Sequence, residues 1–154
     1  MPFEFPVRIY WEDTDAGGIV FYANYLKFFE RARTEWLRSL GLGQQRLREQ
    51  TGGMFVVTDA RLRYLRPARL DDALIVTAHL QETGRASLTI VQQALLNNEQ
   101  SASQPRLVLS EGTIRIGWVD AASMRAPSDR FRGLGRSTSQ PRGVVVMCTW
   151  SKCP

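Results

Sequence analysis

The sequence predicts an α+β domain in which an antiparallel sheet wraps around one long helix. From about Ala23 to Leu40, apolar side chains recur at helical spacing, and a strand-like segment precedes them. The segments after this helix are short, alternating or apolar, and separated by turn-forming sequences. No helix long enough to connect parallel strands is expected between them, so the strands are predicted to pair antiparallel.

The first strand is expected from Phe5 to Trp11. Its apolar residues stand two apart, which is typical of a strand with one buried face. These residues are Phe5, Val7, Ile9 and Trp11. Pro6 lacks a backbone N–H, so we expect this strand at an edge of the sheet, or Pro6 at its beginning. The stretch WEDTDAGG that follows is rich in turn formers and is expected to form a loop leading into the helix.

The helix is expected to end at Gly41. Its apolar stripe consists of Tyr25, Phe28, Phe29, Ala32, Trp36 and Leu40. Arg33 projects beside this stripe, where a charged side chain needs either an extended stem or a polar partner. We interpret Arg33 as a residue at the boundary of the stripe.

Five later runs are predicted strands: Met54 to Thr58, Ala60 to Tyr64, Leu74 to Thr83, Ser87 to Leu96, and Leu107 to Val119. Their breaks include RPARLDD, ETGRA and NNEQSASQP, which suit turns. Residues 1–127 are therefore predicted to form one domain. Residues 128–154 are rich in Gly, Ser, Pro and Arg, and are expected to form a flexible basic tail.

The composition limits the compartment and the partners. No window approaches the roughly 18 consecutive apolar residues that span a bilayer, and the N-terminus lacks the pattern of a signal peptide. We therefore expect a cytoplasmic protein without a membrane span. The net charge of +5 suggests an anionic partner: nucleic acid, a membrane surface or a phosphorylated small molecule. Both cysteines lie in the last seven residues, so no disulfide framework, metal cluster or cofactor is expected to organise the fold.

Most common catalytic patterns are missing from the sequence. The only histidine, His79, lies within a predicted strand, and no serine has a Gly-x-Ser-x-Gly setting, so Ser-His-Asp, Cys-His and zinc chemistry are poorly supported. Gly17 and Gly18 do not complete a dinucleotide-binding or phosphate-loop motif.

What remains is a carboxylate, Asp15, in the loop that runs into the helix N-terminus. The unpaired N–H groups there can stabilise the oxyanion that forms when a nucleophile adds to a thioester, while the carboxylate supplies or activates that nucleophile. An aspartate before a helix is more often a cap or turn residue. The spacing alone leaves both interpretations open.

The string RIYWEDTDAGGIVFYANYLKFFERARTEWLRSLGL, residues 8–42, closely resembles the 4-hydroxybenzoyl-CoA thioesterase family of hotdog-fold proteins, especially its Tol-Pal-associated acyl-CoA thioesterase branch. RYLRPARLDD, residues 63–72, adds a second matching block. The resemblance implies a hotdog domain that hydrolyses acyl-CoA to free acid and CoA. It also implies a homodimer or homotetramer, because the family's sheets pair across protomers and its sites lie between subunits.

The resemblance also implies roles for individual residues. Asp15 matches the family's catalytic aspartate, a nucleophile or general base, and Tyr22 matches the residue whose backbone N–H polarises the thioester carbonyl. The loop that packs around the acyl group corresponds to Gly18, Ile19 and Val20. The hairpin that meets the nucleotide of CoA corresponds to residues 83–87, which makes Arg85 and Ser87 the expected phosphate contacts. Many members of the Tol-Pal branch have histidine at the position of Tyr22, whereas the 4-hydroxybenzoyl-CoA enzyme has tyrosine.

Three other functions have less support in the sequence. A nonenzymatic module that binds acyl carrier protein or a cell-envelope complex would suit the basic surface, but Asp15 beside the glycine turn favours an enzyme. A hotdog dehydratase would need a histidine beside an acid, and His79 lies on the wrong element. Nucleic-acid binding is not expected, because the basic residues of the predicted domain alternate with acidic ones and form no known motif.

Overall fold

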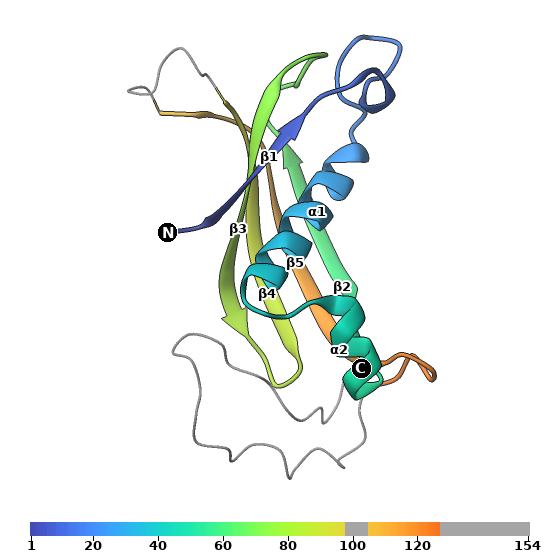
Figure 1. Cartoon of the computed structure of the whole chain (residues 1–154). Helices are drawn as coiled ribbons and strands as arrows, with labels where there is room; N and C mark the ends of the chain where they lie inside the picture. The colour runs from blue at the N-terminus through green and yellow to red at the C-terminus, as the bar shows by residue number, and fades with distance from the viewer. Residues whose placement is uncertain (98–104, 127–154) are drawn as a thin grey trace.

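The computed structural model describes residues 1–97 and 105–126, which form a five-stranded antiparallel sheet with a long helix across one face (Figure 1). Its elements are β1 (Phe3–Arg8), a short 3-10 helix η1 (Trp11–Asp13), α1 (Asn24–Ser39), α2 (Gln44–Thr51), β2 (Gly53–Tyr64), β3 (Ala73–Thr83), β4 (Ser87–Leu96) and β5 (Leu107–Asp120). The strand order is β1-β3-β4-β5-β2. The predicted α+β class and antiparallel pairing are confirmed. The predicted tail, residues 128–154, lies outside the described residues.

Most of the predicted apolar stripe of α1 packs against the sheet, but Leu40 is 40% exposed, and Leu37, which was not predicted as part of the stripe, is buried. Phe28, Phe29 and Ala32 are fully buried at the N-terminal half of the helix. Leu37 continues the contact further along, where it meets Ile90 and other buried side chains of the central strands. Burying a large aliphatic or aromatic side chain contributes about 1.5–3 kcal/mol, so this stripe is what holds α1 on the sheet.

The first strand is shorter than predicted. Pro6 does lie on an edge strand, since β1 pairs only with β3. Ile9 is buried as expected, but the prediction that Trp11 shares this buried face is wrong, because its side chain is 80% exposed. The chain leaves the sheet after Arg8 and turns into η1, where the backbone N–H of Tyr10 donates to the Asp13 carboxylate at 2.8 Å.

Two features around β2 differ from the prediction. Two short strands were expected, but β2 is continuous over twelve residues, with an irregularity in register between Val57 and Asp59. The helix α2 was not predicted. No residue of α2 is buried, so its sequence, QQRLREQT, has no apolar stripe to reveal it. It ends at Gly52, whose φ of 72° suits a helix terminus.

Arg33 is not a boundary residue: the structure buries it between α1 and the sheet. Its Nη1 donates to Oε1 of Gln92 on β4 at 2.8 Å. The amide nitrogen of Gln92 donates in turn to the carbonyl oxygens of Phe29, at 3.0 Å, and Thr77, at 3.2 Å. Burial lowers the pKa of Arg33 from its ordinary value, because a desolvated guanidinium is less stable when charged. These bonds tie α1 to β3 and β4.

None of the helices in the described part of the chain has the length and apolar character needed to cross a bilayer.

Candidate active site

The loop between β1 and α1 is organised by Asp13, which is buried. The carbonyl oxygen of Asp13 accepts hydrogen bonds from the Phe21 N–H and from the side-chain amide of Asn24, both at 2.9 Å. Its carboxylate is occupied by Tyr10. Asp13 therefore holds the two ends of the loop together. The cap or turn role that an aspartate before a helix often has is filled here by Asp13.

Asp15 lies exposed at the tip of this loop. Its backbone N–H donates to Ile19 at 2.9 Å, and its carbonyl accepts from Gly18 at 3.1 Å, while a bridge between Thr14 and Val20 closes the base. One carboxylate oxygen, Oδ1, accepts the Gly17 N–H at 2.8 Å. Within the described residues the other oxygen, Oδ2, accepts no hydrogen bond. The turn thus orients the carboxylate through one oxygen and leaves the second available.

The backbone N–H of Tyr22 points away from the first turn of α1. The carbonyl of Phe21 accepts from the Asn24 N–H at 2.9 Å, so it is directed into the helix. In a planar trans peptide the N–H points opposite to the carbonyl, and the Tyr22 N–H is therefore directed out of the helix end. It makes no hydrogen bond to any described residue. It is a free donor where the helix dipole places a partial positive charge.

Aromatic side chains lie next to that of Tyr22. The ring of Tyr22, 62% exposed, lies 4.7 Å from that of Phe21 and 6.2 Å from that of Tyr64 on β2. Tyr64 also lies 5.6 Å from Tyr25 and donates its hydroxyl to the Tyr22 carbonyl at 3.0 Å. Tyr25 and Tyr64 were not predicted as site residues from the sequence. The second matching block, RYLRPARLDD, contains Tyr64 and was the only signal for it.

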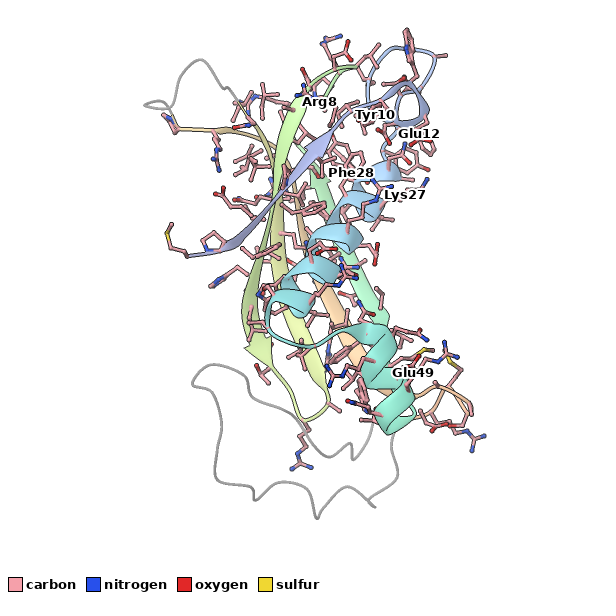
Figure 2. All side chains as sticks on the ribbon, in the orientation of Figure 1. Arg8, Tyr10, Glu12, Lys27, Phe28 and Glu49 are labelled. Carbon is pink, nitrogen blue, oxygen red and sulfur yellow. The ribbon has the colours of Figure 1, made fainter. Side chains whose placement is uncertain are left out.

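That second block, residues 63–72, also forms backbone contacts with the loop. The Val20 N–H donates to the Ala68 carbonyl at 2.9 Å, and Ile19 forms a bridge with Arg69. Val20 is buried and Ile19 is half-buried, whereas Gly18 is exposed with a φ of 74° that favours glycine. The predicted residues Asp15, Gly18, Ile19, Val20 and Tyr22 are thus brought together on one loop. Figure 2 shows Tyr10 and Glu12 in the same loop, at the end of the molecule where α1 begins.

The other two predicted residues lie elsewhere in the protomer. Arg8, just before the loop, pairs with Ala73 at the start of β3, whereas Arg85 and Ser87 follow the end of β3. The eleven residues of β3 separate the two regions by roughly 30 Å, and Figure 1 shows them at opposite ends of the sheet. Ser87 is buried, and its hydroxyl accepts from Arg115 at 3.3 Å. The structure does not bring these two residues to Asp15 within one chain.

A metal-dependent site has no support in the ranges described. Across residues 1–97 and 105–126, no three His, Cys, Asp or Glu side chains lie together in an arrangement that could hold a metal ion. The groups that the loop offers for chemistry are the Asp15 carboxylate and the Tyr22 backbone N–H.

The sequence of this chain is similar to those of known thioesterases. The family profile described as "Thioesterase superfamily" matches residues 17–101. "Acyl-CoA thioesterase YbgC" of Haemophilus influenzae is 43% identical over 123 residues, 80% of this chain and 85% of that protein. The chain belongs to the thioesterase superfamily. A second relative, "Acyl-CoA thioester hydrolase YbgC" of Escherichia coli O157:H7, is 39% identical over 123 residues, 80% of this chain and 86% of that protein.

Solved structures agree with this thioesterase assignment. A probable thioesterase from Bartonella henselae superposes with a TM-score of 0.72 at 27% identity, covering 82% of this chain and all of that one. A protein from Aquifex aeolicus gives a TM-score of 0.69 at 28% identity, covering 79% of this chain and 91% of that one. The predicted hotdog fold and the predicted enzyme class, a thioesterase, are confirmed. The profile's match begins two residues after Asp15, so it includes the glycine turn and α1 but not the aspartate.

Proposed function

We propose that this protein hydrolyses acyl-CoA thioesters to free acid and CoA, with Asp15 as the catalytic carboxylate and the Tyr22 N–H as the donor to the thioester carbonyl oxygen. One observation carries the proposal: the loop presents both an oriented carboxylate and an unoccupied backbone donor at a helix N-terminus. Relatives that are named acyl-CoA thioesterases support the substrate class. Gly18, Ile19 and Val20 are proposed to pack around the acyl group.

The chemistry has two routes. Asp15 can attack the thioester carbonyl, expel the CoA thiolate and form an acyl-aspartyl anhydride, which water then hydrolyses. Alternatively, Asp15 takes a proton from a water molecule that attacks the carbonyl, and the tetrahedral intermediate expels the thiolate. In both routes negative charge develops on the carbonyl oxygen, where the Tyr22 N–H and the dipole of α1 stabilise it.

The proposal includes an oligomer. β2 presents an open edge twelve residues long, and such an edge is normally paired or covered. A homodimer or homotetramer would also allow Arg85, and with a local rearrangement Ser87, to reach CoA bound at the loop of another protomer. Sedimentation velocity is expected to show species larger than the 17.5 kDa chain; a 17.5 kDa species alone at micromolar concentration would refute the assembly.

Three finer assignments follow from the resemblance and the sequence. They are membership in the Tol-Pal-associated branch, a cytoplasmic location, and acyl carrier protein as a further partner that would present its thioester to the same loop. The net charge of +5 suits an acidic partner of that kind.

Replacing Asp15 by asparagine tests the function. Turnover of acyl-CoA is expected to fall by at least about a hundredfold, the low end of what a positioned acid–base group contributes, with folding intact. Glu49→Gln is the matched control, because it removes the same charge from an exposed residue of α2 that bonds only Gln45 within the described part of the chain. Near-normal turnover in Asp15→Asn would return Asp15 to a turn role. Ligand binding without hydrolysis in the wild-type protein would favour the nonenzymatic module.

Oxygen-18 labelling separates the two routes. In a single turnover in labelled water, attack by Asp15 leaves the label in the Asp15 carboxylate when water attacks that side of the anhydride. A general base leaves the label only in the product acid. Mass measurement of the peptide containing Asp15 distinguishes the outcomes.

A further inference from the structure

Tyr64 and Tyr22 are joined by a hydrogen bond between residues 42 positions apart in the chain. Tyr64 is the last residue of β2, and its hydroxyl donates to the Tyr22 carbonyl at 3.0 Å. Its ring also contacts those of Tyr22 and Tyr25, at interplanar angles of 83° and 59°. The end of an edge strand therefore holds the start of α1.

Among the residues that the structure describes, the Tyr22 carbonyl accepts no other hydrogen bond. At the start of α1, the Phe21 carbonyl accepts from the Asn24 N–H and the Ala23 carbonyl accepts from the Leu26 N–H. The carbonyl of Tyr22 lies between these two but is not part of the same hydrogen-bond series. Among the described residues no backbone N–H donates to it. The helix does not fix the peptide between Tyr22 and Ala23. The Tyr64 hydroxyl does.

The Tyr22 N–H lies in the preceding peptide, between Phe21 and Tyr22, and fixing the peptide after Tyr22 restrains the dihedral angles that connect this N–H to α1. The orientation of a residue's backbone N–H and carbonyl depends on the two rigid peptide planes that flank its Cα. The plane before Tyr22 is held through the Phe21 carbonyl and the Asn24 N–H, and the plane after it is held by Tyr64. With both planes held, neither dihedral angle of Tyr22 can drift as helix ends otherwise tend to do.

We propose that Tyr64 is a positioning residue for the thioester-binding donor: its hydroxyl holds the Tyr22–Ala23 peptide, so that the Tyr22 N–H stays directed at the developing oxyanion. The kinetic consequence rests on the proposed function. Tyr64 does not transfer a proton in this role. Partial burial, with the neighbouring Tyr22 phenol, raises the pKa of Tyr64 above its ordinary value, so the hydroxyl remains a donor at neutral and mildly alkaline pH.

Tyr64→Phe removes one oxygen atom and keeps the ring contacts. It is expected to lower kcat about fivefold to tenfold, the equivalent of one neutral hydrogen bond, with KM changed less than about twofold. The same factor is expected throughout the range from about pH 6 to pH 9, because no titrating group is removed there. Thr58→Val is the matched control, since it removes another hydroxyl of β2 that donates to a backbone carbonyl, that of Arg115 at 3.3 Å, six residues before Tyr64.

Amide hydrogen exchange tests the inference without any substrate. In Tyr64→Phe, exchange of the Asn24 and Leu26 amides, which are hydrogen-bonded at the start of α1, is expected to rise while the rest of α1 stays protected; unchanged exchange there would overturn the proposal. So would normal kcat in an active Tyr64→Phe enzyme, a rise in KM alone, or a defect that varies with pH. Failure of the proposed function itself would appear separately, as normal turnover in Asp15→Asn.

Discussion

The ring of Phe29 on α1 lies so close to Gly112 on β5 that a Cβ atom at Gly112 would come within 2.8 Å of Phe29 Cε2. Gly112 sits between Leu62 of β2 and Gln92 of β4 in the sheet register. The missing side chain lets α1 approach the sheet at this point.

Gly112→Ala is therefore expected to destabilise the fold by about 1–3 kcal/mol, the usual cost of overpacking a core, as measured by urea unfolding. Gly43→Ala is the control, because a Cβ there would meet only Arg46 at 4.0 Å. Equal stability of both variants would show that the Phe29 ring moves at little cost.

The buried pair of Arg33 and Gln92 predicts non-additive stability. Gln92→Leu removes the oxygen that accepts from Arg33 and should cost about 2 kcal/mol or more, since a buried donor loses its partner. Arg33→Met with Gln92→Leu should recover part of that loss, because no buried charge then remains. Urea unfolding of the two single variants and the double variant measures the coupling. Strict additivity would mean that the hydrogen bond contributes nothing specific.

Local periodicity predicted most of the fold but not this pair. The stripe of α1, the apolar run of β3 and the alternation in β4 each extend over a few neighbouring residues, so the sequence shows them directly. The partner of Arg33 lies 59 residues away on another element. Nothing within the helix distinguishes a buried arginine with a partner from one at the edge of the stripe.

In the candidate site too, residues close together in the sequence were predictable, whereas a residue brought in by the fold was not. Asp15, Gly18 and Tyr22 lie within eight residues of one another, so a contiguous motif could identify them. Tyr64 joins them only because β2 folds back beside α1. Arg85 was assigned through the family resemblance, and the register of β3 then places it at the far end of its own protomer.

Gly18→Ala should affect activity more than stability. Gly18 has a φ of 74°, and a side chain there costs roughly 1 kcal/mol and distorts the turn that orients Asp15. Gly41→Ala is a matched control, because Gly41 has a φ of 81° at the far end of α1. Both variants should lose similar thermal stability, but only Gly18→Ala should lose kcat/KM. An equal loss of kcat/KM in both would separate the turn from catalysis.

Tyr25 predicts a loss of stability in alkali. Burial raises the pKa of Tyr25 above its ordinary value of about 10, so the folded protein keeps this proton at a pH where the unfolded chain releases it. Its contribution is fully present below about pH 10 and is lost as pH rises toward the folded pKa, with a slope of up to about 1.4 kcal/mol per pH unit. Urea unfolding across this range should show a steeper decline for the wild type than for Tyr25→Phe. Parallel curves would contradict the burial effect.

Arg85 is expected to contribute to binding from a neighbouring protomer. Arg85→Ala should raise KM for acyl-CoA and change kcat little, because a phosphate contact remote from the carbonyl stabilises substrate and transition state equally. The effect should shrink for an acyl-pantetheine, which lacks the nucleotide, and Arg46→Ala on α2 controls for the loss of positive charge.

Mixed oligomers identify which subunit supplies Arg85 to a given site. When Asp15→Asn chains are mixed with Arg85→Ala chains, contact between protomers creates some sites with an intact Asp15 from one chain and an intact Arg85 from the other. Those sites should restore a fraction of activity with the wild-type KM. Contact within one chain would leave every active site with the raised KM, and mixing would restore nothing.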